Sequence, residues 1–354
     1  MRAVSMASAS GIAGRMVVGR KPGARERRIS TASVFLATEG VDMKIGLSLT
    51  TAYPREEPPV GRFQQLVQQV EAARDHGFHS VWVGDHHVTP HLYYQSIPAI
   101  ARLTAHAGTM QIGPFLLLPL YPPVLLAEQM ATLDVIADGR LTLMIALGWQ
   151  PEAYAAFGIP WKERVARFEE GVAILRLLFD TDKADYVGRF QRFEGVSFQP
   201  KPVHRRIPLW IGASAEPAIR RAARLGDAWI VGPLTPLETV KAQMGIYQAA
   251  LQEYGRAGAV DEFPMRRDVF IAEDRETALK IVEPVLNAGY RGVRGNPLDV
   301  LIVGGPQEFA EKVEQLRAFG TTHLLLRFIV PDQEHILRAI QIIGEQVLPQ
   351  VSRA

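Results

Sequence analysis

"IPLWIGASAEPAIRRAARLGDAWIVG" (residues 207–232) is the stretch of sequence that decides the fold. Its two ends, 207–214 and 227–232, are mostly apolar and predict buried strands. The segment 216–226 between them predicts a helix, which stops at a glycine. Two apolar strands joined by one helix are typical of parallel strands in an α/β protein.

The same alternation continues in both directions along the chain. Strands are expected at 44–50, 78–85, 109–118, 140–148, 207–214, 227–232, 265–272 and 322–330. Helices are expected at 62–77, 93–108, 123–139, 162–179, 216–226, 236–254, 275–288, 306–319 and 333–347. About eight strands that alternate with helices predict a parallel sheet, and their apolar composition indicates a sheet covered on both faces. Trp82, Trp210 and Trp229 lie inside strands and are expected in the core.

We therefore predict an α/β fold, a (β/α)8 TIM barrel with insertions, as a single domain over residues 43–350. Two stacked α/β domains are the alternative, but no linker-like change of composition occurs near the middle of the chain. A hairpin is expected within 185–206, after the fourth helix, and a loop at 290–305. Both segments are long enough to be lids or binding loops.

Composition restricts the function further. The chain has 354 residues, a formal net charge of +2 and no cysteine. So small a net charge gives no general attraction to nucleic acid or to membranes. Without cysteine there are no disulfides, thiolate metal sites or cysteine nucleophiles, which fits a cytoplasmic protein. The longest apolar run, 113–126, contains several prolines and is too short to span a bilayer.

Residues 1–42 differ from the rest of the chain. They are rich in Ala, Ser, Gly and Arg and show no clear periodicity. A transit-type presequence has this composition. The favoured interpretation is a disordered or non-native extension, with Met43 as the natural start.

The strand end "VWVGDHHVTPH" (81–91) carries the main candidate for chemistry, because in a barrel the functional groups gather where strands end. His86 and His87 are adjacent, so they point in different directions and are poorly arranged to share one metal. The other histidines form no ligand cluster, and no metal site is expected. No GxSxG motif of a serine hydrolase occurs. Two interpretations are left: a structural histidine, and a histidine that faces the barrel mouth as a base or hydrogen-bond donor.

A second candidate is the strand exit Gly212-Ala213-Ser214, just before a helix. Ser214 is a plausible N-cap, and the free N–H groups of a helix start attract anions, so a phosphate cradle is one interpretation and ordinary capping is the other. No GxGxxG motif and no P-loop occur, which disfavours classical dinucleotide or P-loop binding.

Five segments in order resemble the bacterial luciferase-like monooxygenase family, a class of flavin-dependent oxidoreductases. They are "GFHSVWVGDHHV", "IGPFLLLPLYPPVLLAEQMATLDVIADGRLTLMIALGW", "FGIPWKERVARFEEGVAILRLLF", "IPLWIGASAEPAIRRAARLGDAWIVG" and "IVGGPQEFAEKVEQLRAFGTTHLLLRF". The resemblance covers roughly residues 43–350 and implies the same (β/α)8 barrel. It implies that His86 lies beside the flavin ring and acts in the oxygenation chemistry.

The resemblance also implies a set of cofactor-binding residues. Phe115 and Leu116 match a non-proline cis peptide that lies against the flavin ring, and a cis bond of this kind costs about 3 kcal/mol. The residues that match the ring-lining and phosphate-binding regions are Gly148, Trp149, Gln150, Gly212, Ala213 and Ser214. Leu147 stands where some members have a phosphate-binding arginine, so the phosphate is left to backbone N–H groups, Ser214 and Arg220 or Arg221.

The choice of cofactor stays open between two branches of the family. Asp85-His86 resembles the branch that uses the deazaflavin coenzyme F420, whereas His87 resembles the flavin branch and Pro90 replaces a tryptophan of the deazaflavin branch. We favour a monooxygenase that uses reduced FMN and oxygen on a small organic substrate. The alternatives are an F420-dependent dehydrogenase or reductase and a catalytically idle flavin-binding barrel. A partner flavin reductase and a homodimer are further expectations, with neither nucleic acid nor membrane as a partner.

Overall fold

The computed structural model describes residues 43–291, 293 and 295–351, which belong to one compact unit. The expectation for residues 1–42 lies outside the described residues. None of the helices in the described part of the chain is long and apolar enough to cross a bilayer.

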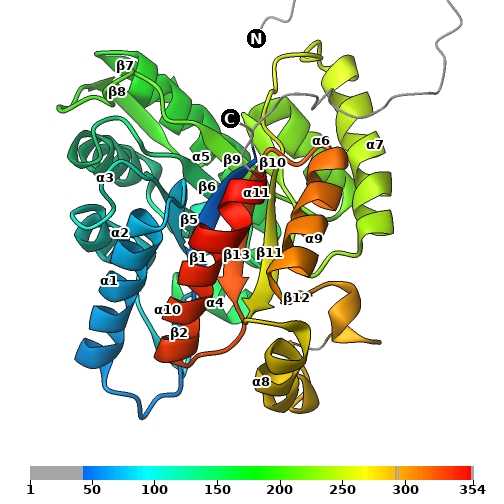
Figure 1. Ribbon diagram of the computed structural model, residues 1–354. Coiled ribbons are helices and arrows are strands. Elements are labelled where there is room, and N and C mark those ends of the chain that lie inside the picture. Colours follow the sequence, from blue (N-terminus) through cyan, green and yellow to red (C-terminus); the bar gives the residue numbers. More distant parts are fainter. Residues whose placement is uncertain (1–42, 292, 294, 352–354) are drawn as a thin grey trace, which may run out of the picture. The chain divides into compact units, whose positions relative to one another are not determined.

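A nine-stranded parallel sheet forms the centre of the molecule, in the order β10-β9-β6-β5-β3-β1-β13-β11-β12 (Figure 1). Its strands are β1 (Lys44–Leu49), β3 (Ser80–Val83), β5 (Gln111–Leu117), β6 (Leu143–Ala146), β9 (Leu209–Gly212), β10 (Ala228–Ile230), β11 (Pro264–Ile271), β12 (Ile302–Gly304) and β13 (His323–Phe328). A parallel bridge between Val231 and Met265 brings β10 beside β11. The sheet thus curls back on itself, and the predicted α/β barrel is confirmed.

Helices surround this sheet. They are α1 (Pro59–Asp75), α2 (Ser96–Thr104), α3 (Pro123–Ile136), α4 (Pro151–Ala156), α5 (Arg164–Asp180), α6 (Glu216–Leu225), α7 (Leu237–Glu253), α8 (Arg275–Asn287), α9 (Pro306–Ala318), α10 (Gln333–Ile342) and α11 (Leu348–Val351). Several begin where the sequence supplies a start signal: Pro59 is the first residue of α1, and the side chain of Asp274 accepts a hydrogen bond from the Thr277 N–H at the start of α8. The nine predicted helices are all present.

The buried core consists of several clusters, and two of them lie on the two faces of the curved sheet. The larger of these two lies between strands and outer helices and includes Ile112, Leu143 and Leu209. The smaller of these two fills the barrel interior, where Trp82 and Trp210 stack with ring centroids 4.7 Å apart. All three strand tryptophans are buried, as predicted, because apolar strands covered on both faces leave no exposed position for them.

The hairpin of β7 (Ala184–Val187) and β8 (Arg192–Val196) confirms the expected element but not its expected role as a lid. The carboxylate of Glu170 in α5 accepts hydrogen bonds from the N–H groups of Arg189, Phe190 and Gln191 at its turn. The hairpin connects a helix to the next strand, so it packs along α5. In Figure 1 it lies at the opposite end of the barrel from β2 and α4.

Two short strands were not expected. β2 (Ala52–Tyr53) and β4 (Leu92–Tyr93) pair in antiparallel fashion just after the ends of β1 and β3. The segment 290–305, expected to be a loop, contains β12, which pairs with the carboxyl half of β11. Strands of two or three residues are too short to show a periodicity in the sequence.

Packing in the barrel interior predicts that Gly113→Ala destabilises the protein. A Cβ atom at Gly113 would lie 1.9 Å from Cε3 of Trp82, which is held by its stacking on Trp210. We expect the free energy of unfolding to fall by about 2 kcal/mol or more in urea titrations. Gly245→Ala is the matched control, because nothing lies within 4 Å of its Cβ position on the exposed side of α7, and it should stabilise the helix by about 0.5 kcal/mol. Equal effects of the two variants would contradict this account of the core.

Candidate functional site

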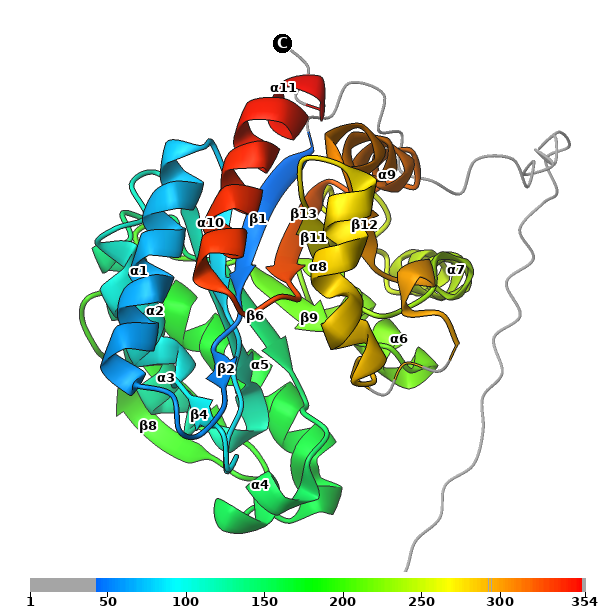
Figure 2. The same cartoon turned by 60° about the horizontal axis from the view of Figure 1, so that its bottom comes forward.

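The candidate site lies at the carboxyl ends of the barrel strands, the end turned toward the viewer in Figure 2. Here β3 ends at Val83 and continues into Gly84, Asp85, His86 and His87. Val88 has a φ of 52°, an uncommon value for a β-branched residue, where the chain turns away from the strand direction. We call this end of the barrel, with the segments that follow the strands, the mouth.

The Asp85 carboxylate joins two neighbouring strands at the mouth. Its Oδ2 accepts hydrogen bonds from the Leu117 N–H at 2.9 Å, from the Tyr121 hydroxyl at 3.0 Å and from His87 Nε2 at 3.1 Å. The Asp85 side chain is 0% exposed. Its other oxygen, Oδ1, is buried and has no hydrogen-bond partner among the described residues. An acceptor of this kind is costly to leave unpaired, which points to a donor from a ligand.

The two histidines have different surroundings, as their adjacency predicts. His87 is buried against Asp85, and its ring centroid lies 5.1 Å from that of Phe157. His86 is partly exposed, and its ring packs on Tyr93 at 5.4 Å. Burial lowers the pKa of His86 below its usual value of 6.5, and the adjacent His87 lowers it further. His86 is therefore a neutral imidazole at pH 7, able to accept or donate a proton.

The mouth has a floor of small and aromatic side chains from three adjacent strands. A Cβ atom at Gly212 would lie 3.5 Å from Cβ of Ala146 and 3.6 Å from Cζ of Phe115. Gly148 has a φ of +77°, which favours glycine at the turn after β6. Of the predicted cofactor-binding residues, Phe115, Gly148 and Gly212 thus lie around this floor. The side chain of Leu116 points into the outer core, where it is fully buried.

The expected cis peptide between Phe115 and Leu116 is wrong. Among the described residues the only cis bond is Gln199–Pro200, which precedes a proline. A trans bond at Phe115–Leu116 is the ordinary state, because the cis form of a non-proline bond costs about 3 kcal/mol.

The turn after β9 differs in detail from the expected phosphate cradle. The N-cap of α6 is Ala215, with no side-chain hydrogen bond, and Ser214 is exposed one residue earlier, so the predicted Ser214 cap is wrong. The turn is held by its carbonyl groups: the Trp229 indole donates to Ala213 O at 2.9 Å and the Gln243 amide to Ser214 O at 2.7 Å.

The expected helpers of a phosphate already have carboxylate partners. Arg220 pairs with Glu253, and Arg221 pairs with Glu169 at 3.0 Å. Neither arginine is thus a free guanidinium beside Ser214.

Trp149 and Gln150 follow β6 at the mouth. Trp149 is 76% exposed, a value that only Val187 equals among the exposed large apolar residues of the described chain. Gln150 occupies the N-cap position of α4. An exposed indole in the segment that follows β6 can contact a flat ligand at the mouth.

Sequence reasoning missed three groups of residues at the mouth. Tyr93 was expected in a helix, but it lies in β4. Its hydroxyl forms a hydrogen bond with Thr51. The same hydroxyl lies close to Gly84, where an added Cβ atom would be 2.9 Å from the Tyr93 oxygen. β11 places Arg266 and Asp268 on the inner face of the barrel, and β13 adds Arg327. The charged pattern "MRRDVF" inside a predicted strand is the sequence signal that could have pointed to Arg266 and Asp268.

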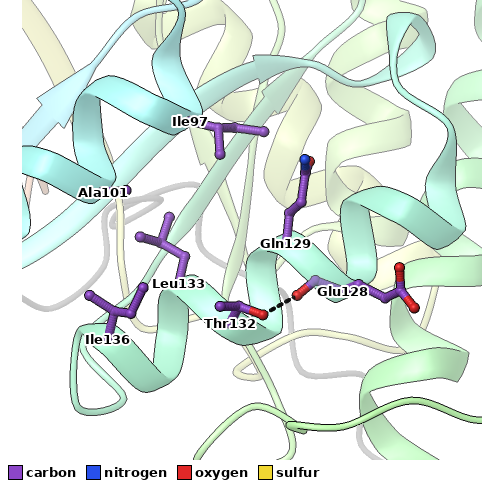
Figure 3. Close-up of a pocket in the computed structure, with 7 residues that line it drawn as sticks. All are labelled: Ile97, Ala101, Glu128, Gln129, Thr132, Leu133 and Ile136. Carbon is purple, nitrogen blue, oxygen red and sulfur yellow. Dashed lines mark hydrogen bonds between the residues drawn. The ribbon is translucent and has the colours of Figure 1, made fainter.

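Other features of the structure do not belong to this site. Figure 3 shows a shallow pocket between α2 and α3, lined by Ile97, Ala101, Glu128, Gln129, Thr132, Leu133 and Ile136. None of these residues is a candidate catalytic or cofactor-binding residue. Within residues 43–291, 293 and 295–351, no three His, Asp or Glu side chains come together as a metal site.

The fold defines the class of protein: an α/β barrel whose candidate site lies where the strands end, as in TIM-barrel enzymes. Residues 43–323 match the family described as luciferase-like monooxygenase, and the chain belongs to that family.

Relatives of the chain include enzymes named for FMNH2 and enzymes named for F420. The chain is 26% identical over 291 residues to the FMNH2-dependent dimethylsulfone monooxygenase of Pseudomonas putida, a match covering 73% of this chain and 78% of the relative. It is 26% identical over 323 residues to the F420-dependent glucose-6-phosphate dehydrogenase of Nakamurella multipartita, covering 81% and 92%.

A crystal structure of a monooxygenase from Streptomyces bottropensis is similar to the chain with a TM-score of 0.77 at 25% identity, covering 87% of this chain and 99% of that one. The chain is thus an oxidoreductase of this family, whose members use FMNH2 or F420.

The hydrogen bonds of Asp85 predict a large loss of stability in Asp85→Ala. The substitution leaves the partly buried Leu117 N–H without its acceptor and leaves the Tyr121 hydroxyl only His87 as a partner, at 3.3 Å. We expect the free energy of unfolding to fall by about 3 kcal/mol. Tyr121→Phe removes one donor and should cost about 1 kcal/mol. Asp180→Ala, an exposed carboxylate at the end of α5, should change stability by about 0.5 kcal/mol or less. Urea unfolding measures all three. A loss in Asp85→Ala no larger than in Asp180→Ala would contradict the role given to Asp85.

Proposed function

We propose that the protein is a flavin-dependent monooxygenase that uses reduced FMN and oxygen on a small organic substrate. The observation that carries the proposal is the pairing of a buried, unpaired acceptor, Asp85 Oδ1, with a neutral, partly exposed imidazole on the next residue, His86. The similarity to an FMNH2-dependent monooxygenase supports the choice of reaction.

The residues at the mouth fit a flavin. A flavin ring is flat and largely apolar, and its pyrimidine part carries an N–H donor that needs an acceptor. The floor of Phe115, Ala146 and Gly212 is flat enough for close approach, since Gly212 has no side chain, and Asp85 Oδ1 can accept the N–H bond. The exposed indole of Trp149 can cover the ring. When bound, reduced FMN would supply the electrons for the activation of oxygen.

The chain's own residues then have separate tasks. Asp85 fixes the positions of Leu117 and His87 and binds the ring. His86 holds or transfers a proton at one imidazole nitrogen, because its lowered pKa keeps it neutral at pH 7. The Tyr93 ring packs on His86 and limits its orientations. The backbone turns at Gly148 and Gly212 let a ligand approach the main chain closely.

An F420-dependent dehydrogenase is the second candidate. The Asp85-His86 pair and the similarity to an F420-dependent enzyme of Nakamurella multipartita favour it. Both cofactors share the pyrimidine ring, so Asp85 Oδ1 suits either. Pro90 and His87 favour the flavin branch, by the resemblance noted above.

A titration distinguishes these candidates. Purified protein is titrated anaerobically with reduced FMN and, separately, with reduced F420, and binding is followed by fluorescence. We expect reduced FMN to bind at least tenfold more tightly, a difference of about 1.4 kcal/mol. Tight binding of F420 alone would replace the monooxygenase by the dehydrogenase. Binding of neither cofactor would contradict both enzymes.

The role of His86 predicts a specific kinetic defect. In His86→Ala the oxygen-dependent oxidation of bound reduced FMN should slow by about 100-fold, the usual contribution of a positioned acid or base. In the unmodified protein the rate should be constant from pH 8 to pH 7 and fall only below pH 6.5, because acid protonates His86 only below its lowered pKa. Stopped-flow absorbance measures both.

The matched control is His91→Ala, a nearby exposed histidine that should leave the rate at neutral pH unchanged. Its pH profile should shift only slightly, because His91 lowers the pKa of His86 less than burial and His87 do. An unchanged rate in His86→Ala with FMN still bound would remove His86 from the mechanism.

A further inference from the structure

The inner face of β11 carries charged side chains in the barrel, where apolar residues are the rule. Arg266 is the register partner of Leu325 in β13, and Leu325 belongs to the interior cluster with Trp82 and Trp210. Residues paired across parallel strands lie on the same face of the sheet, so Arg266 points into the barrel. Asp268, two residues further, lies on the same face and is paired with Arg327.

Asp268 is a buried carboxylate with all its hydrogen bonds made. The Arg327 guanidinium donates to both oxygens at 2.8 Å, a bidentate pair. The Tyr290 hydroxyl donates to Oδ2 at 2.6 Å, and Arg291 donates to the same oxygen at 3.0 Å. The Asp268 side chain is 0% exposed. One negative charge therefore satisfies Arg327 and attracts Arg291 as well.

Arg266 has no such partner among the described residues. Its Nε is buried and makes no hydrogen bond with any described residue. The next residue, Arg267, points to the outside of the barrel and donates to the carbonyl groups of Gly232 and Pro233. Burial lowers the pKa of Arg266 to about 10; the charge of Asp268 opposes this shift, and Arg327 and Arg291 add to it. The guanidinium is therefore still charged at neutral pH, and Arg266, Arg291 and Arg327 face the single carboxylate of Asp268.

This excess of positive charge lies at the mouth. Arg266 and Arg327 both lower the pKa of Tyr93 electrostatically, against the larger effect of burial, which raises it. The Tyr93 hydroxyl lies beside Gly84 at the end of β3, and its ring contacts His86. The Arg266 guanidinium and the His86 imidazole therefore lie on two sides of Tyr93, at the same part of the mouth.

We propose that Arg266 binds an anionic group of the substrate, a carboxylate, sulfonate or phosphate, and that the enzyme acts on molecules that carry one. That the anion belongs to a substrate rests on the function proposed above, whereas the anion site itself rests only on the charged cluster. Planar N–H donors match the oxygens of such anions, and an anion at Arg266 would balance the excess charge. The cluster of Asp268, Arg327 and Tyr290 fixes the neighbouring strands, so that the site exists before the substrate arrives.

The first test is the stability of the protein without ligand. Arg266→Met keeps the length of the side chain and removes an unpaired charge, so we expect the melting temperature to rise by about 2 °C or more. Arg192→Met, an exposed arginine on the hairpin, is the control and should change it little. A melting temperature lowered by Arg266→Met would show that Arg266 supports the fold, which overturns the proposal.

The second test measures binding of the small anions acetate, methanesulfonate and inorganic phosphate at constant ionic strength. Tryptophan fluorescence reports it, since Trp82 and Trp210 belong to the interior cluster that includes Leu325, the register partner of Arg266. At least one anion should bind, with the neutral acetamide as the negative control. Arg266→Met should weaken binding at least tenfold, whereas Arg266→Lys, which keeps the charge, should weaken it only a few fold. Binding of none of the anions, or unchanged binding in Arg266→Met, would overturn the proposal.

A third measurement separates the substrate from the cofactor as the source of the anion. FMN carries a phosphate and riboflavin does not. We expect Arg266→Met to leave the affinities for both flavins within about twofold of those of the unmodified protein. A tenfold loss for FMN alone would assign Arg266 to the cofactor phosphate and overturn the proposal. If the unmodified protein binds small anions but no flavin or F420, the proposed function fails while the anion site stands.

Discussion

The Asp85 carboxylate is the constraint on which the mouth of the barrel depends. One of its oxygens accepts three hydrogen bonds, from the backbone of β5, from Tyr121 and from His87, and so joins the ends of β3 and β5. Since the carboxylate is fully buried, these bonds are shielded from water and fix the geometry of the strand ends. His86 is the next residue in the chain after Asp85, so the fixed position of Asp85 places the His86 imidazole at the rim of the mouth.

The filling of the barrel decides how deep a ligand can reach. The stacked rings of Trp82 and Trp210 occupy the interior, and Gly113 leaves the space that Trp82 needs. A ligand is therefore confined to the level above them, which is bordered by Phe115 and Gly212 on one side and by the charged residues of β11 and β13 on another. The apolar side suits a flat ring, and the charged side suits an anion, so one mouth offers two chemically different surfaces.

Much of the fold could be predicted from the sequence, because buried parallel strands are apolar runs separated by helices of regular length. The mouth could be predicted only in part. The Ser214 cap and the cis bond at Phe115–Leu116 were wrong, since both depend on local backbone angles that residue types do not determine. The packing of the 185–206 hairpin along α5 depends on the carboxylate of Glu170, a tertiary contact that the local sequence does not reveal.

The missed residues show a different limit. Tyr93 belongs to a pair of two-residue strands that have no periodicity to read. Arg266 and Asp268 were visible as charges inside a strand, but their meaning requires the register that brings Arg327 opposite Asp268. A charge in a predicted buried strand is thus a sign of function that only tertiary structure can interpret.

Amide hydrogen exchange with and without reduced FMN tests the central claim most directly, namely that the strand ends around Asp85 form the cofactor site. The account predicts added protection at 84–87, 115–117, 146–150 and 212–214, with no change at the pocket between α2 and α3 or at the hairpin of β7 and β8. Protection confined to either of those places, or absent from the Asp85 region while FMN is bound, would contradict it.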